Sequence, residues 1–358
     1  MNISTDLDRV SPDFNKPPNG YEWWYFDGLS TDGKYGFVII FYHDNPFSTK
    51  KIAKLERDGL SKAPHPAISI SIYSNNKTIY YSFLEFDEKE FAWDNEELKL
   101  TIENHSFQYD IRENMLCFEM KVDQKLASGY GIKGEIRGQG GLTPSSLIES
   151  KSKDDHMWNL VLPVMEFEAE LEVNGLNGKE GLLLEGRGYH DHNTGYEPMK
   201  DSFKDWYWGR CHFDEFTLIY YLMDKHDSQQ LEAWLIDADN QTVHESITDA
   251  EWSYNTKNWF GLNSARKIEL ESSQVSVNIQ CKDKIDDGPF YQRFRSDFII
   301  NYNGQVYAVH GISEYILPQN IYRKLFWPLV HMRLRYIDEK PHWVQKSKLM
   351  YPWTWQPK

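Results

Sequence analysis

Apolar and polar residues alternate over much of this chain, and this two-residue period is the strongest constraint on its fold. In the clearest run, residues 165–173, Met165, Phe167 and Ala169 alternate with glutamates that supply a wet face. Successive side chains of a β-strand point to opposite faces, so such a run predicts a strand with one buried side. Further runs lie at residues 68–72, 98–102, 116–122 and 275–279. Many short strands joined by turns predict an all-β fold of barrels or sandwiches.

Aromatic residues make up 15% of the 358 residues, with 13 Trp, 22 Tyr and 19 Phe. They favour β-strands and line binding cavities, so the composition indicates a β protein with a ring-lined pocket. The formal net charge is −15. Because a negative field of this size repels phosphate backbones, we expect no nucleic-acid partner.

The sequence carries the signs of a cytoplasmic chain. Its longest clear apolar run, residues 37–42, is far shorter than the ~20 residues of a membrane-spanning helix. The polar N-terminal residues lack the apolar segment of a signal peptide. Cys117, Cys211 and Cys281 lie far apart in the sequence, as expected of free thiols in a reducing compartment. We therefore expect a cytoplasmic protein with no transmembrane segment.

A weak internal repeat relates the two halves of the chain. Trp24 and Trp206 lie about half the chain apart, each in a ring-rich stretch that precedes a long apolar run, at residues 37–42 and 216–223. The simplest explanation is two similar β domains in tandem, residues 1–195 and 196–358, each with a ring-rich strand paired to an apolar one.

The densest group of polar side chains is GRGYHDHNTG, residues 186–195, at the junction of the two halves. If this segment is extended, His190 and His192 share one face and Asp191 points to the other. Three interpretations stay open: two metal ligands joined by a distant carboxylate, an Asp/Asn-rich turn, or a catalytic carboxylic acid between imidazoles. No third ligand is spaced to match the histidines, so we expect no metal. Phosphate-binding, dinucleotide-binding and zinc motifs are absent from the sequence, so we expect no cofactor.

With these residues in view, the chain resembles the carotenoid 1,2-hydratase family, also called hydroxyneurosporene synthase or AttH-like, which includes lipocalin-like pericyclases (Diels–Alderases). The resemblance rests on YEWWYFD at residues 21–27, on His156-x-Trp158, and on GYHDHN at residues 188–193. Residues 206–209 and 311–315 also fit the family pattern. The resemblance covers most of the chain from about residue 21 onward.

This resemblance implies two tandem lipocalin-like antiparallel β-barrel domains, with a pocket at or near their interface. It also implies a cofactor-independent enzyme that hydrates or cyclises a large hydrophobic polyene or prenylated substrate by acid catalysis. By position, the family's proton donor falls on Asp191. An intramolecular Diels–Alder pericyclase, a lipocalin-like carrier of a hydrophobic ligand and a carbohydrate-active protein remain alternatives. The expected partner is a hydrophobic small molecule.

The candidate site combines the junction motif with the ring clusters. A buried carboxyl can stay protonated near neutral pH and protonate an alkene, and ring faces can stabilise the resulting cation. The catalytic candidates are Asp191, His190, His192 and His156. The substrate-binding candidates are Trp24, Tyr25, Trp158, Tyr189, Tyr207, Trp208 and Glu314.

Overall fold

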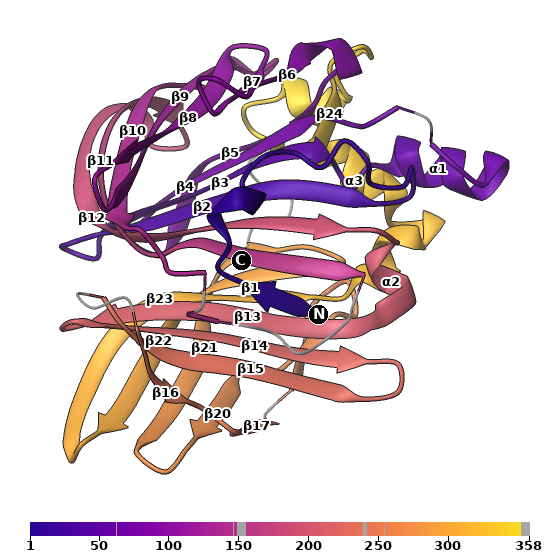
Figure 1. Ribbon diagram of the computed structural model, residues 1–358. Coiled ribbons are helices and arrows are strands. Elements are labelled where there is room, and N and C mark those ends of the chain that lie inside the picture. The colour runs from indigo at the N-terminus through magenta and orange to yellow at the C-terminus, as the bar shows by residue number, and fades with distance from the viewer. Residues whose placement is uncertain (62, 146, 149–154, 239–241, 254, 352–358) are drawn as a thin grey trace. The chain divides into compact units, whose positions relative to one another are not determined.

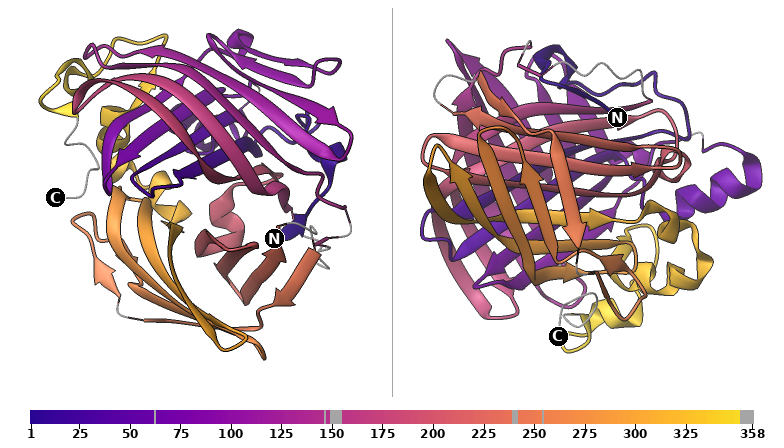
Figure 2. Two further views of the ribbon diagram at one scale, coloured as in Figure 1. Left: turned by 90° about the vertical axis from the view of Figure 1, so that its left-hand side faces the viewer. Right: turned by 90° about the horizontal axis from the view of Figure 1, so that it is seen from below.

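The structure is a computed structural model that describes residues 1–351 except residues 62, 146, 149–154, 239–241 and 254. Strands account for 60% and helices for 12% of it, which confirms the all-β prediction. The chain forms two compact units: Met1–Pro198 with the described part of Lys324–Thr354, and Met199–Arg323. Each unit holds one large curled sheet (Figure 1 and Figure 2).

The first unit is built on one sheet, in which twelve strands form a continuous path and β1 (Asn2–Ser4) pairs with β11. In sheet order the path is β24 (Leu334–Tyr336), β5 (Lys77–Glu85), β4 (Ala67–Ser74), β3 (Tyr35–Asp44), β2 (Tyr21–Ser30), β12 (Gly178–Gly195), β11 (His156–Gly175), β10 (Gly131–Gly141), β9 (Met115–Lys125), β8 (His105–Arg112), β7 (Lys99–Ile102) and β6 (Phe91–Asp94). Strand β2 therefore lies beside β12, although the two are far apart in sequence.

The second unit has a nine-stranded antiparallel sheet. Its order is β16 (Thr242–Ser246), β15 (Gln229–Asp237), β14 (Phe216–Lys225), β13 (Phe203–Phe213), β23 (Gln305–Ile316), β22 (Tyr291–Tyr302), β21 (Val275–Asp287), β20 (Lys267–Glu271) and β17 (Asp249–Ser253). The short strands β18 (Thr256–Lys257) and β19 (Asn263–Ser264) pair separately. The α-helices are α1 (Thr49–Asp58), α2 (Met199–Ser202) and α3 (Trp327–Arg333). Within the described residues, no helix is long and apolar enough to cross a membrane.

The predicted pairing of a ring-rich strand with an apolar one holds in both units. Strand β2 pairs antiparallel with β3, and β13 pairs antiparallel with β14. The alternating runs also form strands, and their apolar positions enter the two hydrophobic cores. In β11, for example, Met165, Phe167 and Ala169 are buried in the first core, whereas Glu166 and Glu168 are exposed.

The segment after Lys324 belongs to the first unit, whereas the domain division based on the repeat places it in the second domain. Strand β24 pairs in parallel with β5, and the Thr49 hydroxyl of α1 lies 2.6 Å from the Tyr336 hydroxyl and 2.7 Å from His331 Nε2. A repeat cannot indicate this arrangement, because β24 is an edge strand of a sheet whose other strands lie far from it in the sequence. The division into independent domains at residues 195 and 196 stays a prediction.

Candidate active site

The junction motif forms the last part of β12, between β11 and β2 (Figure 1). Its side chains alternate between the two faces of the sheet, as predicted. His190 and His192 point to the hydrophobic core, and Asp191 points to the opposite face. That opposite face changes along β12, from exposed Glu185 and Arg187 to buried Tyr189 and Asp191. We call the buried part, made by β11, β12 and β2, the Asp191 face.

Asp191 is almost completely buried, at 1% exposure, and its carboxyl is tightly held. Its Oδ2 accepts hydrogen bonds from Trp158 Nε1 at 2.6 Å and from the Tyr189 hydroxyl at 2.8 Å. Its Oδ1 accepts one from Asn193 Nδ2 at 2.5 Å. Three donors therefore fix the direction of the carboxyl and are placed to stabilise negative charge on it.

Strand β2 brings a second aspartate and tyrosine to this face. In the register of the two strands, Tyr25 lies opposite Asp191, and Asp27 lies opposite Tyr189. The Tyr25 hydroxyl donates to Asp27 Oδ2 at 3.1 Å. This register depends on a close approach of the two backbones, because a Cβ on Gly188 would collide with the Asp27 carbonyl oxygen. The Asp191 face thus carries two Tyr–Asp pairs on adjacent strands.

A row of aromatic rings continues the Asp191 face toward the ends of β2 and β11. Tyr21 and Trp23 stack with ring centroids 4.8 Å apart, and Trp23 meets Trp158 edge-on at 6.2 Å. His156 lies at the end of this row, where its Nδ1 is 2.8 Å from the Tyr21 hydroxyl and its Nε2 is 3.3 Å from Glu197. His156 therefore holds the Tyr21 ring, which stacks on Trp23.

His190 is part of the hydrophobic core. Its ring stacks on Phe26 with centroids 3.8 Å apart, its Nδ1 is 2.8 Å from the Tyr25 carbonyl oxygen, and its Nε2 is 2.5 Å from the Tyr109 hydroxyl. The carbonyl can only accept, so Nδ1 carries the proton and Nε2 accepts from Tyr109. Burial lowers the pKa of His190 to about 3, so the ring is neutral near pH 7.

This buried imidazole predicts a stability that falls in mild acid. Between its usual pKa of 6.5 and the folded value near 3, the unfolded chain binds a proton that the folded chain does not. As the pH is lowered through this window, the free energy of unfolding should therefore fall by up to ~1.4 kcal/mol per pH unit. Denaturant titrations should show a shallower pH slope for His190→Gln than for the wild type. Substitution of the exposed His226 should leave the slope unchanged, and equal slopes in all three proteins would contradict the assignment.

His192 joins a buried polar network that anchors the N-terminal segment. Its Nδ1 lies 2.5 Å from the Arg9 carbonyl oxygen, and its Nε2 lies 3.0 Å from Glu22 Oε1. Glu22 also accepts hydrogen bonds from Lys16 at 3.0 Å and from His43 at 2.8 Å. Burial alone would raise the pKa of Glu22, but hydrogen bonds from His192 and His43 hold it well below the usual value.

The remaining candidate residues lie away from the Asp191 face or in the second unit. Trp24 is in the first core, stacked on His192 at 4.4 Å. In the second unit, the Tyr207 hydroxyl accepts from the Ala265 amide, Trp208 is buried, and Glu314 accepts from Arg293 at 2.7 Å. Substrate contacts by these four residues stay predictions.

Four residues of the Asp191 face were not among the catalytic and substrate-binding candidates given above: Tyr21, Trp23, Asp27 and Asn193. Of these, Asp27 is next in line for the acid role on sequence grounds, because it adjoins the first ring cluster. All four lie within the motifs that carry the family resemblance. They share the parity of Tyr25 or Asp191 along their strands, so two-residue spacing is the signal that could have found them.

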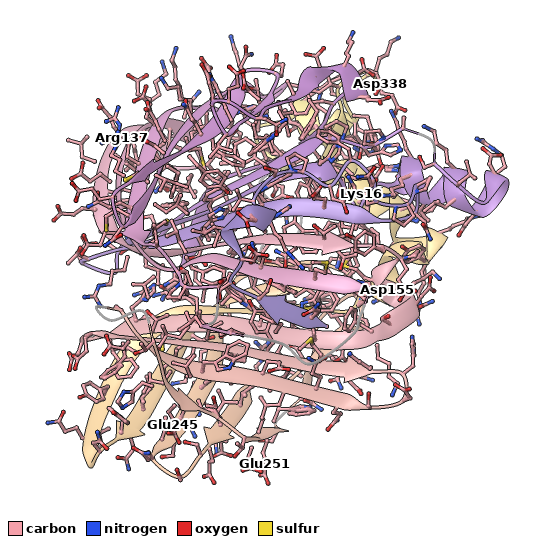
Figure 3. The ribbon with its side chains drawn as sticks, viewed as in Figure 1. Lys16, Arg137, Asp155, Glu245, Glu251 and Asp338 are labelled. Atoms are coloured by element: carbon pink, nitrogen blue, oxygen red, sulfur yellow. The ribbon has the colours of Figure 1, made fainter. Side chains whose placement is uncertain are left out.

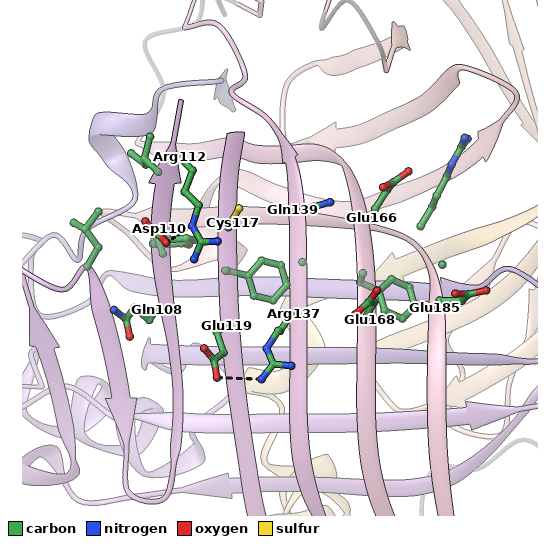
Figure 4. Close-up of a pocket in the computed structure, with 18 of the residues that line it drawn as sticks. Gln108, Asp110, Arg112, Cys117, Glu119, Arg137, Gln139, Glu166, Glu168 and Glu185 are labelled. Atoms are coloured by element: carbon green, nitrogen blue, oxygen red, sulfur yellow. Dashed lines mark hydrogen bonds and ion pairs between the residues drawn. The ribbon is translucent and has the colours of Figure 1, made fainter. Parts of the chain in front are cut away.

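A separate recess of about 1120 Å³ lies on the polar side of β8–β12 (Figure 4) and contains none of the candidate site residues. Figure 3 shows Arg137 on the outside of this curled sheet. In the recess, Arg137 pairs with Glu119 at 3.7 Å, and Asp110 and Glu168 add further charge. Such a lining does not suit an apolar ligand. Elsewhere, no three His, Cys, Asp or Glu side chains of the described residues are grouped to hold a metal ion.

A sequence model of the carotenoid hydratase CrtC family matches residues 58–339. The chain belongs to this family. It is 27% identical over 351 residues to a hydroxyneurosporene dehydrogenase of Chlorobaculum tepidum, covering 91% of this chain and 90% of that protein. It is 26% identical over 216 residues to an acyclic carotenoid 1,2-hydratase of Thiocapsa roseopersicina, covering 58% of this chain and 49% of that protein.

The fold has solved counterparts. The crystal structure of CghA with Sch210972 superposes with a TM-score of 0.61 at 12% identity, covering 84% of this chain and 89% of that one. The lipocalin-like prediction and the family resemblance are therefore confirmed. As a carotenoid hydratase family member, the chain is an enzyme of the lyase or isomerase type that hydrates or cyclises a hydrophobic substrate.

Proposed function

We propose that this enzyme adds water to an alkene of a hydrophobic polyene, and that Asp191 is the proton donor. The observation that carries the proposal is a buried carboxyl held by three donors on an aromatic face. The named activity of the Thiocapsa relative, hydration of an acyclic carotenoid, suggests a polyene substrate.

The donors around Asp191 suit an acid that must lose its proton. When the alkene takes the proton, negative charge develops on the carboxyl oxygens, and Trp158, Tyr189 and Asn193 already point hydrogens at them. Donors aimed at developing charge lower the barrier without having to reorganise. Trp158 and Tyr189 therefore act as hydrogen-bond donors to Asp191, in addition to the substrate contacts predicted for them.

The rings of the Asp191 face can stabilise the carbocation that follows protonation. A cation over an aromatic ring gains ~0.5–2 kcal/mol, and more when water is excluded. Tyr25, Trp23 and Trp158 are all less than a tenth exposed, so they offer ring faces in a dry setting.

Protonation followed by water addition is redox-neutral and needs only an acid, a base and water, so we propose that the enzyme works without a cofactor. We also propose a cytoplasmic location, because all three cysteines are free.

Isotope incorporation tests this proposal. An acyclic polyene with a terminal trisubstituted alkene should gain the mass of one water, and in D₂O one further deuterium should appear on the carbon next to the new alcohol. An isomer of unchanged mass that carries deuterium would indicate acid-catalysed cyclisation instead. An isomer without deuterium would indicate the pericyclic alternative, and recovery of unchanged polyenes and prenylated compounds would contradict the proposal.

A further inference from the structure

The Asp191 face holds a second buried carboxyl, Asp27, that the mechanism above leaves unused. Asp27 is fully buried and lies opposite Tyr189, whereas Asp191 lies opposite Tyr25. The two aspartates are therefore diagonal neighbours on adjacent strands, a relation that separates Cα atoms by about 7–8 Å. A buried carboxyl so close to the proposed acid calls for a chemical explanation, because burial of a charged group is costly.

Each carboxyl accepts a hydrogen bond from the hydroxyl of a tyrosine two residues away on its own strand. Asp191 receives hydrogen bonds from an indole, a phenol and an amide. Asp27 Oδ2 accepts from the Tyr25 hydroxyl at 3.1 Å. The Tyr25 and Tyr189 rings meet on the same face, with centroids 6.2 Å apart and planes 64° apart. Two neighbouring buried carboxylates repel each other, so such a pair can hold opposite protonation states, which is how enzymes divide acid and base roles.

We infer that Asp27 is the catalytic base, which takes a proton from the water that attacks the cation. The inference rests on the proposed function. The Asp191 proton passes to one alkene carbon, the π electrons form the new C–H bond, and Asp191 is left as a carboxylate. A lone pair of water then forms the C–O bond, and the released proton goes to Asp27. One water is added in total, and exchange with solvent returns both carboxyls to their starting states after the product leaves.

The spacing of the two aspartates suits this division of roles. A base must lie within hydrogen-bond reach of the water, while the acid must reach the alkene carbon. Inverting glycosidases solve a comparable problem with two carboxyls about 6.5–9.5 Å apart, which leaves room for a water between them. The diagonal relation sets the Cα atoms of Asp27 and Asp191 about 7–8 Å apart, so the two carboxyls occupy neighbouring positions on one face.

Azide rescue distinguishes a base from a structural carboxylate. Asp27→Ala should slow hydration by ~10²–10⁴-fold, because water then attacks without a proton acceptor. Azide is an anion that attacks a cation without losing a proton, so it should restore substrate consumption about tenfold or more and give an organic azide. Asp191→Asn blocks formation of the cation, so azide should not rescue it. Asp27→Asn retains the shape of the side chain and should show the same loss, with an unchanged far-UV spectrum.

Three results would overturn this inference. Hydration at the wild-type rate by Asp27→Ala or Asp27→Asn would exclude a base role for Asp27. A slow Asp27→Ala variant that azide does not accelerate would make Asp27 structural. Neither result affects the role of Asp191. If the wild-type enzyme hydrates none of the polyenes tested, the proposed function fails, and the inference fails with it.

Discussion

Asp191→Asn is expected to lower kcat for hydration by ~10²–10⁴-fold while the Kd for the substrate changes little, because the amide retains the shape of the acid but has no proton to transfer. The fold should tolerate the change. The new amide oxygen can accept from Trp158 and Tyr189, while its NH₂ group can donate to Asn193. Asn193 Oδ1 has no hydrogen-bond partner among the described residues, so rotation of the Asn193 amide would supply the acceptor.

Steady-state kinetics and equilibrium binding, measured together, check this prediction. Asp123→Asn is the matched control, since it makes the same change on the surface of the same unit, where the side chain is 54% exposed, and it should retain wild-type kcat. Asp191→Ala should be at least as slow as Asp191→Asn. If Asn retained activity and Ala lost it, a hydrogen-bonding role in a pericyclic reaction would replace the acid role. Near-native turnover of both variants would make Asp191 structural.

Glu22→Ala should lower the free energy of unfolding of the first unit by ~3–5 kcal/mol. The carboxylate is fully buried and accepts from Lys16, His43, His192 and the Asp13 amide. Its removal leaves buried donors without an acceptor, and breaking a buried ion pair by removing one partner typically costs this much. The N-terminal segment, which is held to β12 through His192 and the Arg9 carbonyl, should detach first.

Denaturant titration monitored by tryptophan fluorescence measures this loss. Glu170→Ala on β11 is the control, because this glutamate is exposed and its removal should change stability by less than ~0.5 kcal/mol. The pKa of Glu22 is lower in the folded chain than in the unfolded one, so its contribution is complete above the unfolded value of 4.5 and is lost as the pH falls toward the folded value. A loss in Glu22→Ala no larger than in the control would show that the network does not hold the segment.

The fold was predictable because its signals are local. The alternation of apolar and polar residues in β4, β9, β11 and β21 is visible from neighbouring residues alone. In these strands the apolar side chains of the alternation enter the cores. The pairing of β2 with β3 and of β13 with β14 followed from adjacency in sequence. The segment after Lys324 carries no such signal, because its contacts with β5 and α1 are distant in sequence.

The site was predictable in part, for the same reason. The opposite directions of Asp191 and the histidines follow from strand geometry alone, and so does the shared face of His156 and Trp158. In the junction motif both faces are polar, so the alternation there does not say which face meets the core. The structure turns His190, His192 and Trp24 inward, where His190 stacks on Phe26 and His192 stacks on Trp24.

The sequence by itself determined the strands, the parity of side chains along each of them and the chemical types available at the junction motif. Only the tertiary structure decided that Tyr25 and Asp27 lie beside Asp191 and Tyr189, and that the Trp158 indole reaches the Asp191 carboxyl. These contacts depend on cross-strand register, and a shift of one residue would reverse every face. Register is set by pairing between distant segments, including two irregularities in β11 between Leu160 and Met165. Side-chain periodicity within one strand indicates neither the pairing partner nor these irregularities.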